Sequence, residues 1–435
     1  MSKGGKIMNF AKWETKENMK KYIPLIGVNW NTEVKSSGLP MAYDDNYLYI
    51  SDRLNHSLVI GTTGSGKTQT ITLPLLELAN KAGESVIIHD TKNELYETTS
   101  EMFKENGYNV IRLNFDDAMD SNNWNPLDLP YRLYKEGNKD KAQDMLEELA
   151  FYLIYDLEEV NGDPFWTNSA VNYFTGLALY AFETEKEVSL TTIRDLDIEV
   201  KESGDKFKDK LDKKSSAYIN LSGVLNAPTE TRGSILSVFS QKIKRFISKE
   251  NLNKLLSKSD FDITNIAKEK IIIYVVSGNS NNSERLLPLL ISQVYYAKDE
   301  YSKKEGKINI IVDDFFGLYP IKNFEKMLNY SRGINITFTL MIRGFNDLKN
   351  KYGKENTEIL KLCFANIVYL LSQDIETLEE ISNLCGKTCE DGVVKPLISV
   401  EELKILRVFE AIILIPRIMP IKTKLLPHYE MKKSL

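Results

Sequence analysis

The sequence predicts an α/β protein in which helices cover both faces of a parallel sheet and an all-α domain is inserted into that sheet domain. Three observations support this fold class. A glycine-rich phosphate-loop motif lies between a strand pattern and a helix pattern. Short apolar runs alternate with helical patterns along most of the chain. From about residue 125 to 247, by contrast, only helical patterns occur.

The phosphate-loop motif occupies residues 61–68, which read Gly-Thr-Thr-Gly-Ser-Gly-Lys-Thr and match GxxxxGK[ST]. The apolar run Ser57–Gly61 precedes it, and apolar residues recur at helical spacing after it. Glycines let successive backbone N–H groups converge on a phosphate, and the following helix contributes its positive dipole end. We expect Lys67 to reach the β- and γ-phosphates and the Thr68 hydroxyl to bind Mg²⁺. The predicted nucleotide-binding residues are Gly61, Thr62, Thr63, Gly64, Ser65, Gly66, Lys67, Thr68 and Gln69.

The remaining sheet strands are predicted from near-continuous apolar runs, which are typical of strands covered on both faces. They are Ser85–Asp90, Asn109–Asn114, Ile271–Ser277, Ile308–Asp314, Asn335–Arg343, Asn366–Leu371 and Ala411–Pro416. Helices such as Glu284–Tyr301 and Asn323–Tyr330 lie between them.

The helical stretch contains the predicted helices Asp140–Leu157, Phe165–Phe182, Leu190–Val200, Ser215–Leu225 and Thr231–Ile247. We interpret it as a domain inserted into the sheet domain. The predicted division is therefore an N-terminal adaptor or extension (1–34), a nucleotide-binding domain in two pieces (35–124 and 248–435) and the inserted all-α domain (125–247).

Two adjacent acids, Asp313 and Asp314, end the hydrophobic strand that starts at Ile308. A phosphate loop needs a metal-orienting carboxylate at the end of a neighbouring strand. We expect Asp313 to hold Mg²⁺ together with Thr68, and Asp314 to polarise the attacking water. Paired acids at a strand end are also common as turn or cap residues.

The composition is that of a soluble globular protein, with 42% apolar and 27% charged residues. The net charge of −5 gives no overall basic field, so any nucleic-acid contact requires a local patch. Lys242–Arg245 and Lys349–Lys351 are candidates, although a lysine-rich, near-neutral surface is the commoner explanation for each. No apolar run approaches the roughly 18–20 residues that span a bilayer. Cys385 and Cys389 have metal-like spacing, but no histidine lies near them in sequence, which disfavours a zinc site.

Several segments, in order, resemble the type IV coupling proteins, the TraG-like DNA-transfer ATPases of conjugation and type IV secretion. The segments are 56–68 with the phosphate loop, 89–96 (His-Asp-Thr-Lys-Asn-Glu-Leu-Tyr), 124–127 (Trp-Asn-Pro-Leu), 165–166, 259–262 (Ser-Asp-Phe-Asp), 381–386 and 416–429. The resemblance runs from about residue 35 to the end of the chain.

The resemblance implies a RecA-like motor domain that carries an all-α domain, with ATP and Mg²⁺ as cofactors. It implies an active homo-hexamer, expected to be a monomer when dilute, that binds single- or double-stranded DNA without sequence preference. It also implies partnership with a relaxase or relaxosome and with separate membrane-anchor and channel subunits. The protein would then be cytoplasmic and recruited to the inner face of the cell membrane through a partner, because the usual N-terminal membrane anchor is not recognised here.

The resemblance further implies an arginine finger about nineteen residues after the strand-end acid, where this chain has Arg332. A surface arginine after a helix is usually a solvated charge. Two positions depart from the family pattern: Asp314 replaces a usual glutamate, and Arg343 replaces a usual nucleotide-sensing glutamine. These departures favour a second hypothesis, a docking platform that binds nucleotide but hydrolyses little. A third hypothesis is a HerA- or FtsK-like DNA translocase, which would share the motor but not the Trp124-Asn-Pro segment or the inserted helical domain.

Overall fold

The centre of the molecule is a nine-stranded sheet with the order β14-β13-β10-β4-β9-β8-β5-β7-β6. The computed structural model describes residues 10–22, 25–28, 33–44, 47–51, 53–115, 117–156, 163–278 and 281–431. The strands are β4 (His56–Gly61), β5 (Ser85–Asp90), β6 (Asn109–Asn114), β7 (Ile271–Val276), β8 (Ile308–Val312), β9 (Ile336–Ile342), β10 (Phe364–Leu371), β13 (Glu410–Leu414) and β14 (Ile421–Lys424).

Strands β10 to β6 of this order all run parallel, as predicted. At one side of the sheet, β13 pairs antiparallel with β10, and the edge strand β14 pairs antiparallel with β13. β4, β5, β7, β8 and β9 are buried along their whole length, which explains their continuous apolar sequences. All the parallel strands have their carboxyl ends at one edge of the sheet, so the residues that follow them gather there.

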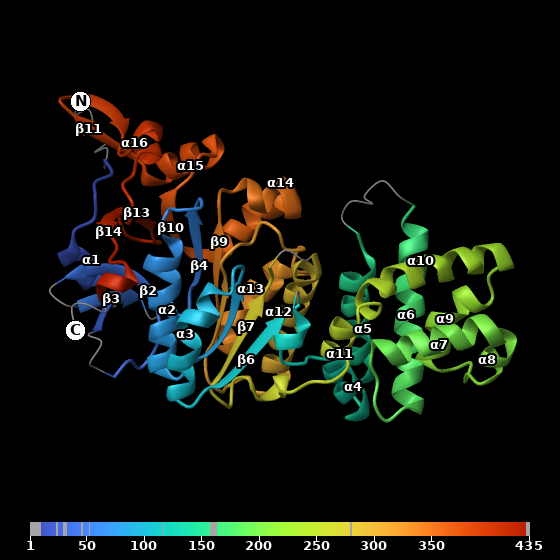
Figure 1. The fold of residues 1–435 in the computed structure, drawn as a ribbon. Coiled ribbons are helices and arrows are strands. Elements are labelled where there is room, and N and C mark those ends of the chain that lie inside the picture. Colours follow the sequence, from blue (N-terminus) through green and yellow to red (C-terminus); the bar gives the residue numbers. More distant parts are fainter. Residues whose placement is uncertain are drawn as a thin grey trace.

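Helices cover both faces of the sheet (Figure 1). The helices α2 (Leu73–Ala82) and α3 (Glu94–Glu105) pack on one face, where Val59, Ile88 and Tyr274 point. The helices α12 (Asn281–Tyr301), α13 (Phe324–Ser331) and α14 (Asn346–Cys363) pack on the other. This arrangement leaves the carboxyl edge free for loops.

A group of helices lies beside the sheet, between β6 and β7 in the chain (Figure 1). Its members are α4 (Asp128–Lys135), α5 (Lys139–Ile154), α6 (Pro164–Thr184), α7 (Leu190–Ser203), α8 (Asp205–Asp209), α9 (Ser216–Leu225), α10 (Thr229–Ile247) and α11 (Glu250–Leu255). No strand occurs in residues 125–156 or 163–247. The predicted helical insertion is therefore present. Its first predicted helix ends at Ile154 and not at Leu157, because Tyr155 is extended; Leu157 itself falls outside the described residues.

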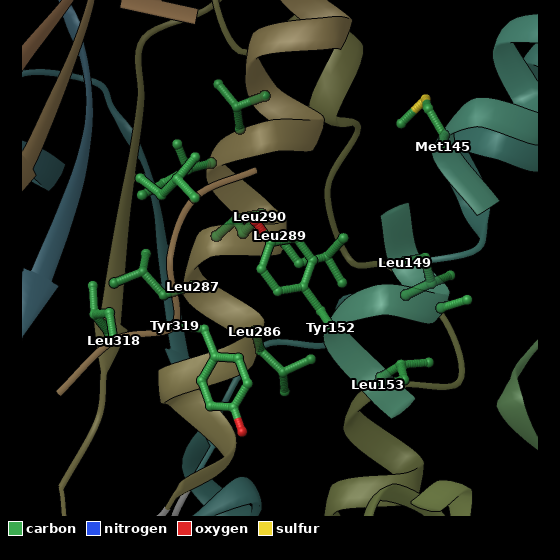
Figure 2. Close-up of a cluster of buried hydrophobic side chains, with 14 of the residues drawn as sticks. Met145, Leu149, Tyr152, Leu153, Leu286, Leu287, Leu289, Leu290, Leu318 and Tyr319 are labelled. Carbon is green, nitrogen blue, oxygen red and sulfur yellow. The ribbon is translucent and has the colours of Figure 1, made fainter. Parts of the chain in front are cut away.

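The helical part is joined to the sheet domain through a packed interface. Tyr152 of α5 points toward Leu286 and Leu289 of α12, and Leu287 lies on the other side of α12, next to Leu318 (Figure 2). Met145, Leu149, Leu153, Leu290 and Tyr319 belong to the same buried cluster. The Tyr152 hydroxyl accepts a hydrogen bond from the Lys322 backbone N–H (3.0 Å). The segments that enter and leave the helical part are hydrogen-bonded to each other. The Asp260 carboxylate accepts from the backbone N–H of Asn123 (2.8 Å) and from its side-chain amide.

The N-terminal segment packs on the sheet domain. The strands β1 (Leu25–Val28), β3 (Tyr47–Ser51) and β2 (Leu39–Asp44) form a small antiparallel sheet, preceded by α1 (Lys16–Tyr22). The Ala11 N–H donates to the carbonyl of Lys387 in β11 (Lys387–Glu390), which forms a hairpin with β12 (Val393–Pro396). Within the predicted extension 1–34, residues 1–9, 23–24 and 29–32 fall outside the described residues.

The C-terminal region adds three further helices, α15 (Ile375–Cys385), α16 (Val400–Lys404) and α17 (His428–Met431). Among the helices of the described residues, none has both the length and the apolar character that crossing a membrane requires.

Candidate nucleotide site

The phosphate loop leaves the carboxyl end of β4 at the centre of the sheet. Gly64 and Gly66 have φ values of 81° and 94°, a region that side chains disfavour. At Gly61 a Cβ would lie 2.4 Å from the Ser65 Oγ and 3.0 Å from the Lys67 Cγ, so any other residue would displace these two side chains of the loop. The loop continues into one turn of π-helix, η1 (Thr68–Thr72), and then into α2. The local sequence thus forms the strand–loop–helix unit that the motif requires.

The Lys67 side chain lies across its own loop. Its ammonium donates to the backbone carbonyls of Gly61 (2.6 Å) and Thr62 (3.2 Å). Burial lowers the pKa of Lys67, whereas the nearby Asp313 and Asp314 act to raise it. A half-buried cation held by neutral carbonyls is suited to bind an anionic phosphate, and a divalent cation bound at the two acids would offset their repulsion of that phosphate.

Three buried oxygen atoms around the loop have no hydrogen-bond partner within the described part of the chain. They are the Ser65 Oγ, the Gln69 Oε1 and the Asp313 Oδ1. Buried polar atoms are normally satisfied. A phosphate group would accept from the serine hydroxyl, and Mg²⁺ with its water shell would engage the carboxylate. The side chains present therefore fit a nucleotide with its metal ion.

Asp313 and Asp314 follow β8, which is separated from β4 by the single strand β9. Burial raises the pKa of Asp313 to about 6, while the Lys67 charge acts to lower it. Asp313 and the hydroxyl of Thr68, the residue after Lys67, offer the oxygen ligands that Mg²⁺ prefers and would hold that ion. Asp314 is more exposed, and its carboxylate accepts the Phe316 N–H (3.1 Å).

Arg343 directly follows β9 and reaches the same edge of the sheet. Its guanidinium pairs with the Asp314 carboxylate (3.0 Å) and lies 4.6 Å from the centre of the Phe316 ring. Its backbone N–H donates to Asp347 (2.7 Å). Arg343 therefore neutralises the acid that was expected to polarise water.

Arg332 lies at the opposite edge of the sheet. It precedes β9, and its guanidinium donates to the Cys363 carbonyl (3.5 Å), just before β10 begins. Its charge helps burial to lower the pKa of His56, the first residue of β4, to about 4. The structure thus brings Lys67, Asp313, Asp314 and Arg343 together but leaves Arg332 at the amino ends of the strands.

Two residues that were not predicted as site residues lie at the end of β5, next to Asp313. The Asp90 carboxylate accepts the Tyr96 N–H (2.8 Å), and burial raises its pKa. The His89 ring is 3.0 Å from the Ser277 hydroxyl, and burial lowers the pKa of His89 to about 4. The sequence signal was available, because both residues sit in a segment that carried the family resemblance.

The two lysine-rich stretches proposed for DNA contact are largely occupied by other partners. Lys242 is buried and pairs with Asp156 (2.6 Å), which Arg245 also contacts (3.2 Å). Lys349 pairs with Glu376, and Lys351 donates to backbone carbonyls. These cations contribute to ion pairs and hydrogen bonds within the fold. A structural role is therefore a better interpretation of both stretches than DNA contact.

The fold and the site together define a class: a P-loop nucleotide-binding protein with the RecA-like fold and a helical insertion. A complete phosphate loop leaves a central parallel strand and faces the acids of another strand at the same edge.

The chain belongs to the family described as type IV secretory system conjugative DNA transfer, which it matches over residues 5–393. No curated protein gives a significant match.

Solved structures with the same fold include the plasmid coupling protein TrwB in complex with the non-hydrolysable ATP analogue ADPNP. It matches at 15% identity and a TM-score of 0.66, covering 97% of this chain and 95% of the solved TrwB chain. TrwB in complex with ADP and Mg²⁺ matches at 14% identity and a TM-score of 0.66, covering 96% and 94%. VirB4 of Thermoanaerobacter pseudethanolicus matches at 14% identity and a TM-score of 0.60, covering 91% and 98%.

Proposed function

We propose that this chain is an ATP-driven coupling protein that recruits a conjugative DNA–relaxase substrate and delivers it to a type IV secretion channel. The observation that carries the proposal is a complete phosphate loop facing Asp313, whose Oδ1 is buried, in a chain of the conjugative DNA transfer family. The TrwB structures with ADPNP and with ADP and Mg²⁺ support ATP and Mg²⁺ as the ligands.

In this proposal the residues 61–69 surround the phosphates. The Lys67 ammonium group leaves the loop carbonyls to which it donates and binds the β- and γ-phosphates instead. Thr68 and Asp313 hold Mg²⁺, which when bound offsets negative charge on the phosphoryl oxygens. Asp314 positions the attacking water once its pairing with Arg343 is broken.

The active assembly in this proposal is a head-to-tail hexameric ring, and the chain is a monomer when dilute. Within the ring, Arg332 of one subunit completes the nucleotide site of its neighbour. In such a ring the two halves of a shared site lie on different faces of one subunit. The phosphate loop and Arg332 lie at opposite edges of the sheet and meet this requirement. Arg332 also lines a pocket with the apolar Leu362, which is 86% exposed and suited to burial against a neighbour.

The partners in this proposal are single- or double-stranded DNA, a relaxase, and separate membrane-anchor and channel subunits that recruit the protein to the inner face of the membrane. The division into 1–34, 35–124 with 248–435, and 125–247 belongs to the same proposal, with 1–34 as the adaptor toward the membrane partner. The family match supports DNA transfer as the shared process.

A second candidate function is a docking platform that binds nucleotide and hydrolyses little. The pairing between Arg343 and Asp314 favours it, because a guanidinium 3.0 Å from the carboxylate opposes its action as a base. A HerA- or FtsK-like translocase would share the motor site. The inserted helical domain and the family match favour the coupling protein over that translocase.

Calorimetry with ATP and Mg²⁺, followed by ATPase assays with and without single-stranded DNA, tests the proposal. A motor binds ATP and hydrolyses it faster with DNA. Binding without turnover, under both conditions and at ring-forming concentration, would favour the platform. If the protein bound no ATP at all, the proposed nucleotide site would be wrong.

A further inference from the structure

An aromatic side chain rests on the backbone of the phosphate loop. Phe409 is the last residue before β13, at the edge of the sheet where β4 ends. A Cβ built on Gly66 would lie 2.9 Å from the Cδ1 of Phe409, so only a glycine lets the ring approach this closely. The Phe409 ring is therefore in direct contact with the loop expected to hold the phosphates.

A second aromatic ring stands beside the first. The Tyr429 ring centre is 6.4 Å from that of Phe409, with an angle of 64° between the planes. Tyr429 belongs to α17, where the neighbouring His428 pairs with Glu77 of α2 (2.8 Å). Because α2 continues the helix that starts at the loop, both rings are fixed relative to the phosphate site.

The position of this pair matches the direction in which a nucleotide must extend. Lys67 and Asp313 mark the β- and γ-phosphate end, and Asp313 follows β8, which lies on the β9 side of β4. Phe409 lies on the other side, beyond β10, next to β13. A nucleotide with its terminal phosphates at Asp313 and its phosphates along the loop therefore carries its base toward Phe409 and Tyr429.

The backbone at Phe409 is unusual for a side chain that serves packing alone. Its φ is 72°, a left-handed conformation that is a clear outlier for a bulky residue. The turn is held by two hydrogen bonds between Arg407 and Glu410 (2.9 and 3.1 Å). Such strain is characteristically retained at ligand sites. Tyr429 is also 46% exposed, so the pair keeps an open aromatic face.

We propose that Phe409 and Tyr429 bind the nucleobase, by stacking or edge-to-face contact with its ring, and so distinguish a nucleotide from a bare polyphosphate. Aromatic rings bind the flat face that all bases share. The inference rests on the proposed function, since it assumes that the loop binds a nucleotide.

Affinities for ATP and for inorganic triphosphate, measured by calorimetry with Mg²⁺, test the proposal. The variants are Phe409→Gly, which removes the ring and fits a positive φ, and Tyr429→Ala. Phe165→Ala is the matched control, since Phe165 is 48% exposed and lies in α6 of the helical part. We expect Phe409→Gly to weaken ATP about tenfold, Tyr429→Ala to weaken it less, and triphosphate binding to be unchanged.

A further variant, Phe409→Trp, keeps an aromatic ring and adds a fluorescent reporter at the proposed base site. Its emission should change on addition of ATP but not of triphosphate. Unchanged ATP affinity in Phe409→Gly, or equal loss for both ligands, would overturn base binding and leave the ring as a packing element. If the parent protein binds triphosphate but not ATP, this inference fails as well. If the parent binds neither ligand, the proposed function itself fails, which is a distinct result.

Discussion

Mixing two inactive variants, Arg332→Ala and Lys67→Ala, should restore part of the ATP hydrolysis that each lacks alone. Arg332 lies near the start of β4 and the phosphate loop begins at its end. At about 3.3 Å per residue, these two ends of the strand are about 16 Å apart, more than one arginine side chain can span. Arg332 can therefore complete only the site of another subunit.

The size of the recovery follows from the geometry of a ring. Removing an arginine finger lowers the rate by roughly three to five orders of magnitude. In an equal mixture, each interface has an intact loop on one side and an intact finger on the other in about a quarter of cases. Activity should then return to about a quarter of the parent rate if interfaces work independently, far above either variant alone.

The assay is steady-state ATP hydrolysis with single-stranded DNA, at a protein concentration where rings form. Arg194→Ala, which removes an arginine of α7 that pairs with its neighbour Asp195, is the matched control and should retain the parent rate. Full activity of Arg332→Ala in dilute, monomeric protein would refute the trans mechanism. It would instead favour Arg343, which already lies at the site, as the source of positive charge.

Three further outcomes are expected. Lys67→Ala should abolish tight nucleotide binding in calorimetry, whereas Asp313→Asn should leave binding measurable and lower hydrolysis by several orders of magnitude; parent-like behaviour of both would mean that the site is misplaced. Arg343→Gln should change the free energy of unfolding by less than about 1 kcal/mol, because the ion pair of Arg343 with Asp314 is half-exposed. The rate of ATP hydrolysis should rise, because the Asp314 carboxylate is freed. A rate loss of orders of magnitude would instead mean that Arg343 acts as an arginine finger on its own subunit's site. Burial lowers the pKa of His56 from 6.5 to about 4 in the folded protein, so the unfolded chain binds a proton on this ring first as pH falls. Up to about 3 kcal/mol of folding stability is therefore present above pH 6.5 and lost as pH falls toward 4. Denaturant melts of His56→Gln should show a correspondingly weaker loss, and a pH profile equal to that of the parent would contradict this assignment.

Much of the sheet could be predicted because its strands are buried on both faces. β5 and β6 have the predicted bounds, and the other central strands differ by one or two residues at their ends. The strands β1, β2, β3 and β14 and the hairpin β11–β12 were missed. Both hairpin strands are largely exposed, and β14 alternates with lysines, so no continuous apolar run marks them. β1 and β3 do carry apolar residues, but over only four and five positions, which is too short to separate a strand from a loop.

The carboxyl edge of the site could be predicted for a related reason. Asp313 and Arg343 directly follow parallel strands, and the phosphate loop follows a third, so all must meet at one edge. Arg332 precedes its strand, which places it at the other edge. The contact of Phe409 with the loop could not be predicted, because it depends on the antiparallel pairing of β13 with β10 and on a strained turn that local sequence does not mark.

The frequency of DNA transfer in the native host tests the central claim most directly. The chromosomal or plasmid copy is deleted, and the parent chain or Lys67→Ala is supplied at equal protein level. The account predicts that deletion abolishes transfer, that the parent restores it, and that Lys67→Ala does not, because transfer requires nucleotide at the loop. Normal transfer after deletion would contradict the coupling role, and full restoration by Lys67→Ala would contradict an ATP-driven mechanism.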